Sequence, residues 1–272
     1  MKTRIGVAWY RTRCQFGRRR GGYLVIVVLL GLVGGLALGS IAAARRTDSS
    51  FPRYLARSNA SDLSVSTGVG SNNNTSAYSS VLMKRIARLP DVRHVEVSAF
   101  LLLGPLESDG APDLKVIASL GAVVSINGLL FNQDRVAVIA GRLANPTKAD
   151  ELMVDQGTAH LLGVHVGQTM EVGGYSGEQT LNPKFGTPQV PPVVRVKAKV
   201  VGIVDLADQV VQDDVDRSTD FVILTPAFGR KALNIVSGET YGVQLKRGAS
   251  DVTKFEQQFA RLVSAVHSSS SM

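Results

Sequence analysis

The stretch GGYLVIVVLLGLVGGLALGSIAAA, residues 21–44, decides how this chain is organised. It contains no charged residue, and as a helix it would be about 36 Å long. The hydrocarbon core of a bilayer is about 30 Å thick, so such a helix can span it with some tilt. A cleaved signal peptide is the alternative, but its apolar core is usually only about 7–15 residues. We therefore predict a transmembrane helix over residues 23–44 that stays in the membrane.

Basic residues are concentrated before this run. Residues 1–22 hold seven of the 30 lysines and arginines and no acidic residue, which makes them a basic tail. Four arginines follow the run, at positions 45, 46, 53 and 57. Because basic flanks favour the cytoplasmic side, we expect a cytoplasmic N-terminus and an extracytoplasmic domain over residues 45–272, in a single-pass protein of the cell membrane.

The rest of the chain is nearly neutral, with 23 basic and 22 acidic residues after position 22. A domain that binds nucleic acid needs a basic face, and this balance argues against one. The lone cysteine, Cys14, excludes an internal disulfide framework and a cysteine-cluster zinc site. We find no phosphate-binding loop, zinc-protease or nucleophile-elbow motif, and predict no catalytic residue, no cofactor and no metal site. The acidic loop around Asp213 and Asp214 lacks the EF-hand pattern; a solvated loop is favoured over a cation site.

Three glycines form a stripe on the apolar segment. Gly31, Gly35 and Gly39 are four residues apart and fall on one helix face. Small residues at this spacing let a second membrane helix approach closely, whereas glycine is also simply common in membrane helices. We predict that the stripe packs against further membrane helices.

Beyond residue 44 the pattern predicts an α+β domain. Residues 45–60 read as a stalk or a continuation of the helix, and Pro52 could lie near a break. Residues 173–192, rich in glycine and proline, read as a mobile loop or a hairpin. The predicted helices cover 82–89, 156–162 and 251–266, and the predicted strands cover 62–67, 92–100, 114–120, 136–139, 151–155, 168–172, 193–204, 221–224 and 241–246.

Two of these strands carry further expectations. Residues 136–139 read as a short buried strand because they are apolar. In strand 92–100, alternation puts Val95 and Val97 on a buried face and His94, Glu96 and Ser98 on a polar one. We expect that second face to be solvated, and His94 with it.

Three sequence stretches resemble those of FtsX-like permeases of ABC transporters with a MacB-like periplasmic core domain. The membrane exit, GLVGGLALGSIAAARRTDSSFPRYLARSNASDL, is similar to the first helix and exit of such permeases. The stretch GRLANPTKADELMVDQGTAHLLGVHVGQTMEV resembles the family's Gly-Arg pair, acidic strand start, short helix and Gly-x-x-Val-Gly before a strand. The stretch VKAKVVGIVD resembles the family's next strand, and the resemblance covers most of residues 20–266.

The resemblance implies a two-lobed outer domain and a non-enzymatic role in transport. The first lobe would comprise about 55–130 with 240–267, and an inserted β-rich lobe would comprise about 131–239. A cytoplasmic ABC ATPase subunit and further permease helices would be the partners, besides the lipid bilayer. A full permease has further membrane helices after this domain, whereas this sequence ends at HSSSSM. We therefore expect the N-terminal part of a permease, with a stand-alone anchored binding or scaffold module as the alternative.

Overall fold

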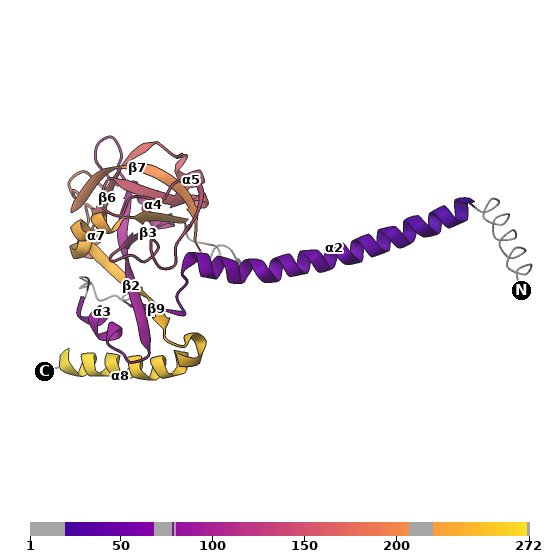
Figure 1. The fold of residues 1–272 in the computed structure, drawn as a ribbon. Coiled ribbons are helices and arrows are strands. Elements are labelled where there is room, and N and C mark those ends of the chain that lie inside the picture. Colours follow the sequence, from indigo (N-terminus) through magenta and orange to yellow (C-terminus); the bar gives the residue numbers. More distant parts are fainter. Residues whose placement is uncertain (1–19, 68–77, 79, 207–219, 271–272) are drawn as a thin grey trace, which may run out of the picture. The chain divides into compact units, whose positions relative to one another are not determined.

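A computed structural model describes residues 20–67, 78, 80–206 and 220–270 (Figure 1). The chain divides into two compact units, residues 1–55 and 56–272. Helix α2, Arg20–Ser58, has 39 residues and would be about 58 Å long. Its segment Leu24–Arg46 is long and apolar enough to cross a membrane, and it is the one such segment among the described residues. The helix continues through Pro52, so residues 45–58 extend it rather than form a separate stalk.

The second unit is built on one nine-stranded mixed sheet. Its strands run in the order β1-β9-β2-β3-β8-β5-β7-β4, and β6 pairs with both β2 and β7. Their bounds are β1 Leu63–Thr67, β2 Val92–Pro105, β3 Leu120–Ser125, β4 Ala137–Gly141, β5 Glu151–Asp155, β6 Thr169–Tyr175, β7 Val194–Asp205, β8 Asp220–Leu224 and β9 Val236–Leu245.

The long antiparallel pair of β2 and β9 runs through the whole unit (Figure 1). At one end, helices α3, Ser80–Ala87, and α8, Val252–Ser270, accompany a core cluster that includes Ile86, Tyr241 and Phe255. Two further core clusters are built mainly from strands β2, β3, β5, β7 and β8, with residues of α7 and of the segment 131–144. The remaining short helices are α4 Leu114–Ser119, α5 Gln156–Leu162, α6 Gly177–Thr180 and α7 Pro226–Ala232, with 3₁₀ turns η2 Leu233–Ile235 and η3 Gly248–Asp251.

The predicted fold class is confirmed, since one apolar N-terminal helix precedes a mixed α+β unit. Helix α5 and strand β5 have the predicted bounds, and Gly163 closes α5 in the left-handed conformation. Strands β6 and β7 pair antiparallel, so residues 176–193 form a hairpin connection, whereas residues 173–175 still belong to β6. The lobe boundaries near 131 and 240 stay predictions.

Two predictions about local structure are wrong, and one helix was missed. Residues 114–119 form helix α4, and strand β3 starts only at Leu120. Strand β4 is not buried: it lies at the edge of the sheet, and Val138 and Ile139 are 41% and 53% exposed. Helix α7, which begins at Pro226 directly after β8, was not predicted.

The polar face of β2 also differs from the prediction. His94 is exposed as expected, but Glu96 and Ser98 are each only 4% exposed. A polar row on a strand reads as solvated unless another part of the chain covers it. Residues 127–135, between β3 and β4, contact this face and bury Glu96.

Candidate functional site

The residues that follow helix α2 are tied to a distant loop. We call residues 58–62, the loop 127–135, Glu96 and Gln244 the exit junction. Asn59 ends the helix in a left-handed conformation, with φ of 53°, which asparagine tolerates better than most residues. Its side-chain amide donates to the carbonyl of Asn132 at 2.9 Å, and Arg135 N donates to the carbonyl of Ser58 at 2.8 Å. The last turn of α2 is therefore held by backbone and side-chain bonds.

Asp134 forms the densest contact of the exit junction. Its Oδ1 accepts from Ser61 N at 2.6 Å, and its Oδ2 accepts from Ser61 Oγ at 2.5 Å. The amide of Gln133 donates to Ser61 Oγ at 2.6 Å. Hydrogen bonds to a charged acceptor are the stronger kind, each worth about 1.5–3 kcal/mol. Asp134 thus clamps the segment after the helix onto the loop.

Glu96 and Gln244 hold the exit junction from the sheet. The Glu96 carboxylate accepts from Gln133 N at 3.2 Å and lies 3.2 Å from His94 Nε2. The side-chain amide of Gln244 donates to the Asn59 side-chain oxygen at 2.9 Å and to the carbonyl of Ala60 at 3.1 Å. Strands β2 and β9, which carry Glu96 and Gln244, are thereby connected to both parts of the exit junction.

Two glycines make room for this packing. A Cβ on Gly128, whose φ is 141°, would lie 2.5 Å from both Glu96 Oε1 and Asn132 Nδ2. A Cβ on Gly242 would lie 2.6 Å from Ser61 Oγ and 3.0 Å from Asp134 Oδ2. These distances are too short for a real side chain, so both positions favour glycine sterically.

The arrangement suits transmission of force better than catalysis. Its carboxylates accept from the backbone amides of Ser61 and Gln133. The Ser61 hydroxyl, which donates to Asp134, is itself held by the side-chain amide of Gln133. Displacing residues 58–62 would break several short hydrogen bonds at once, or else move the loop 127–135 with them. Hydrogen bonds thus tie the residues after the helix, and the loop 127–135, to β2 and β9.

A second charged cluster fixes the connection between β4 and β5, which flank β7 in the sheet. The guanidinium of Arg142 donates two hydrogen bonds of 2.8 Å to the carboxylate of Glu151, and Lys148 Nζ lies 3.2 Å from the same group. Asn145 N donates a further bond of 2.9 Å. The hydrogen bond from Arg142 is the main reason that the pKa of Glu151 is lowered to about 2, and burial opposes it. The Gly-Arg pair and the acidic strand start of the family-like stretch thus meet here.

The sequence-predicted site residues do not belong to the exit junction. Gly31, Gly35 and Gly39 lie on α2, and no other part of the described chain comes within 4 Å of a Cβ built there. Their packing against other membrane helices stays a prediction. Asp213 and Asp214 lie outside the described residues. Within the described part of the chain, no three His, Cys, Asp or Glu side chains gather as a metal site would require.

The exit junction itself was missed. Asn59 fell in the predicted stalk or helix continuation, and no element or role was predicted for Gln133 and Asp134. Nothing local indicates that Ser61 and Asp134 meet across 73 positions. A usable local signal was turn chemistry, because Asn59 and Asp134 are residue types that tolerate a positive φ and often mark sharp chain reversals.

No family model matches the chain, and no curated protein matches its sequence. Among solved structures, the fold is similar to the extracellular domain of the noncanonic ABC-type transporter YknZ from Gram-positive bacteria. That match has a TM-score of 0.42 and 14% identity, and covers 71% of this chain and 85% of that one. The periplasmic region of MacB from Actinobacillus actinomycetemcomitans gives a TM-score of 0.38 and 12% identity, over 69% and 73% of the two chains.

A domain assigned to a permease of Porphyromonas gingivalis is also similar, with a TM-score of 0.35 and 12% identity over 73% of this chain and 82% of that one.

Proposed function

We propose that the chain is the membrane-anchored N-terminal part of an ABC transporter permease. In this role a cytoplasmic ATPase moves the membrane helices, and α2 carries the movement to an extracytoplasmic domain that takes part in transport or extrusion. The chain then catalyses no reaction of its own. The sequence resemblance supports the assignment to this class.

The observation that carries the proposal is the continuity between α2 and the exit junction. One helix contains a segment of membrane-spanning length and ends at Ser58, where the following residues are clamped by Asp134 and Gln244. A passive tether needs no such clamp, because a flexible linker holds an anchored domain equally well. A device that transmits movement needs a stiff helix and a stiff connection.

The proposal has two tests. An affinity-tagged chain, purified from membranes of its own host, is expected to retain a cytoplasmic ABC ATPase and a partner that supplies further membrane helices. If the tagged chain is recovered folded and without any ATPase, the anchored binding or scaffold module becomes the better assignment.

The second test addresses coupling through Asp134. In the complex, ATP is expected to change hydrogen-exchange protection of β2 and β9, and Asp134→Ala is expected to abolish that change while the ATPase stays bound. Asp109→Ala is the matched control, since Asp109 caps an exposed turn at Ala111 N. Equal responses in the two variants would refute transmission through the exit junction.

A further inference from the structure

Acidic and basic side chains are buried very unequally around α3, α8, β2 and β9. The carboxylates of Glu96, Glu239 and Asp251 are buried, with 4%, 6% and 0% of the residue exposed. The lysines and arginines of the same elements are exposed. The composition is nearly neutral, but the exposed charges of these elements are mostly basic.

Six of these bases gather at one end of the second unit. We call this set the basic end; it comprises Arg88, Arg93, Lys246, Arg247, Lys254 and Arg261. The turn Pro90–Asp91 lies at its centre: Lys246 Nζ donates to the carbonyl of Pro90 at 2.5 Å, and the Gln258 amide donates to Asp91 Oδ2 at 2.9 Å. Figure 1 shows α3, the start of β2 and α8 at this same end.

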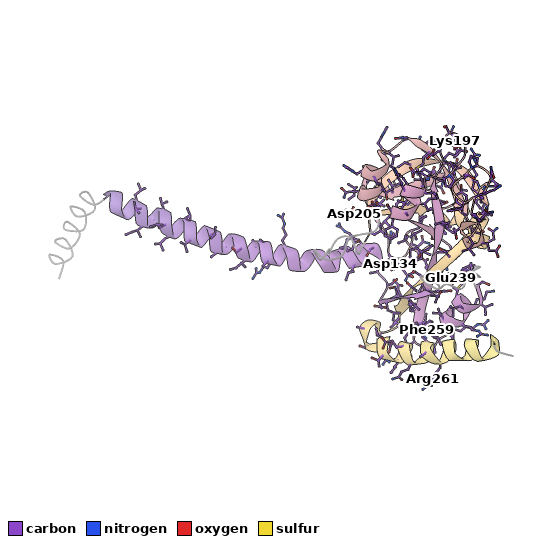
Figure 2. The ribbon with its side chains drawn as sticks, turned by 180° about the vertical axis from the view of Figure 1, so that it is seen from behind. Asp134, Lys197, Asp205, Glu239, Phe259 and Arg261 are labelled. Atoms are coloured by element: carbon purple, nitrogen blue, oxygen red, sulfur yellow. The ribbon has the colours of Figure 1, made fainter. Side chains whose placement is uncertain are left out.

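Helix α8 contributes one basic flank. Its apolar stripe, with Phe255 and Phe259 in contact, faces the core cluster of β2 and β9. Lys254 and Arg261 are seven residues apart, two turns, and so share another side of the helix. Figure 2 shows Arg261 on the side of α8 away from Phe259. Glu256, the exposed acid of α8, falls on the opposite flank.

The basic end has more bases than the two acids, Asp91 and Asp251, that are hydrogen-bonded beside it. Asp251 accepts from Arg247 at 2.6 Å, and Asp91 accepts from Gln258. The four other bases, Arg88, Arg93, Lys254 and Arg261, form no ion pair within 4 Å in the described part of the chain. The surface thus carries a net positive charge that a polyanionic surface can neutralise.

We propose that the basic end binds anionic lipid headgroups of the bilayer in which α2 is anchored. This inference rests on the membrane anchoring within the proposed function. Arg46 ends the candidate span, and Ala56 begins the second unit ten residues later on the same helix, about 15 Å away along its axis. So short a connection, within one continuous helix, keeps the unit close to the lipid surface. Each base close to an anionic surface contributes attraction that falls off within a Debye length, about 8 Å.

A second basic row serves as an internal comparison. Arg195, Lys197 and Lys199 alternate along β7 on one exposed face, and Arg195 pairs with Glu171 at 2.6 Å. Lys197 and Lys199 therefore offer a pair of exposed bases that lies on other strands than the basic end. Replacing both lysines with glutamate changes the net charge of the chain by as much as replacing Arg88 and Arg93 with glutamate.

The test uses the full chain in lipid nanodiscs. Cys14→Ser combined with Gln257→Cys gives one labelling site on α8, and energy transfer to a labelled lipid reports docking. Discs of phosphatidylcholine are compared with discs in which about one third is phosphatidylglycerol. We expect more transfer with phosphatidylglycerol, and its loss in about 1 M NaCl, where the Debye length is about 3 Å.

The double variant Arg88→Glu and Arg93→Glu is expected to lower the ratio of docked to undocked molecules about fivefold or more for each base. The double variant Lys197→Glu and Lys199→Glu is expected to leave this ratio unchanged. The milder pair Arg88→Gln and Arg93→Gln tests the same surface if the reversed variant melts early. Equal transfer in both lipids, or equal loss in the two reversed variants, would overturn the lipid site. A chain that does not enter discs of phosphatidylcholine at all would instead overturn the membrane anchor of the proposed function.

Discussion

At the scale of single residues, the two acidic groups Glu151 and Asp134 show how one carboxylate organises a loop. Each accepts several hydrogen bonds from a segment that has no regular structure of its own. Glu151 is buried and Asp134 half-buried. A carboxylate that loses its donors in such a place is destabilising, most of all at Glu151, so the segment that supplies the donors is held in one conformation. Replacing either acid therefore removes a constraint on the chain as well as a contact.

Glu151 gives a prediction about pH. Its pKa is lowered to about 2 in the folded protein, from an ordinary value of 4.5. A lowered carboxyl pKa adds stability that is complete above about pH 5 and disappears as the pH falls from about 4.5 to about 2. We expect Glu151→Gln to reduce the unfolding free energy by about 2 kcal/mol at pH 7 and by much less near pH 2.5. Thermal melts of the detergent-solubilised chain across pH measure this.

Glu171→Gln is the matched control for this experiment. Glu171 forms the same kind of ion pair with Arg195, but its side chain is 42% exposed, so water screens the pair. The control is expected to melt nearly as the unchanged protein does at every pH. An equal loss of stability in the two variants would show that burial of Glu151 has no special effect.

At the scale of elements, the sequence pattern predicted those elements whose boundaries are set by their own residues. It failed where a capping side chain or a distant loop that covers the element determines the structure. Strand β5 and helix α5 were predicted correctly because their boundaries are set by local residues, Asp155 and Gly163. Residues 114–119 read as a strand from their Val and Ile content, but Asp113 accepts from Lys115 N and Val116 N and starts a helix. Glu96 was misplaced because its cover comes from residues 127–135, which no local pattern reveals.

The cap of α4 can be tested directly. Asp113→Ala removes the acceptor for two backbone amides and is expected to cost about 1 kcal/mol of stability. Asp113→Asn keeps a capping oxygen and is expected to change stability by only a few tenths of that amount. Hydrogen exchange at the amides of residues 115–119 gives a local readout. Faster exchange in both variants alike would mean that the charge matters and the cap does not.

The glycine stripe of α2 leads to a prediction about a membrane partner. Gly35→Leu places a large side chain in the middle of the stripe, where close approach of a second helix requires small residues. We expect weaker co-purification with other permease helices and unchanged insertion, because leucine favours the bilayer. Ala37→Leu makes a similar enlargement on the opposite helix face and is expected to keep the partner. If Gly35→Leu keeps full association with the partner, the stripe has no packing role and reflects only the high glycine content of membrane helices.

At the scale of the whole molecule, the sequence predicts a membrane orientation that the fold makes testable. Leu181 lies in the connection between β6 and β7 and is 74% exposed, so Leu181→Cys in a Cys14→Ser background offers an accessible thiol in the second unit. With the basic tail retained in the cytoplasm, this thiol is expected to react with an impermeant maleimide on intact cells. The unchanged protein is the control from the other side, since its single thiol, Cys14, is expected to react only after lysis. Met153→Cys, at a fully buried position, separates accessibility from topology, because it is expected to react only after unfolding.

If Leu181→Cys reacts only after lysis, the orientation is inverted and the second unit is cytoplasmic. If it reacts outside while the mature chain begins near Arg45, the helix is a cleaved leader, and an exit junction that transmits helix movement would have nothing to transmit.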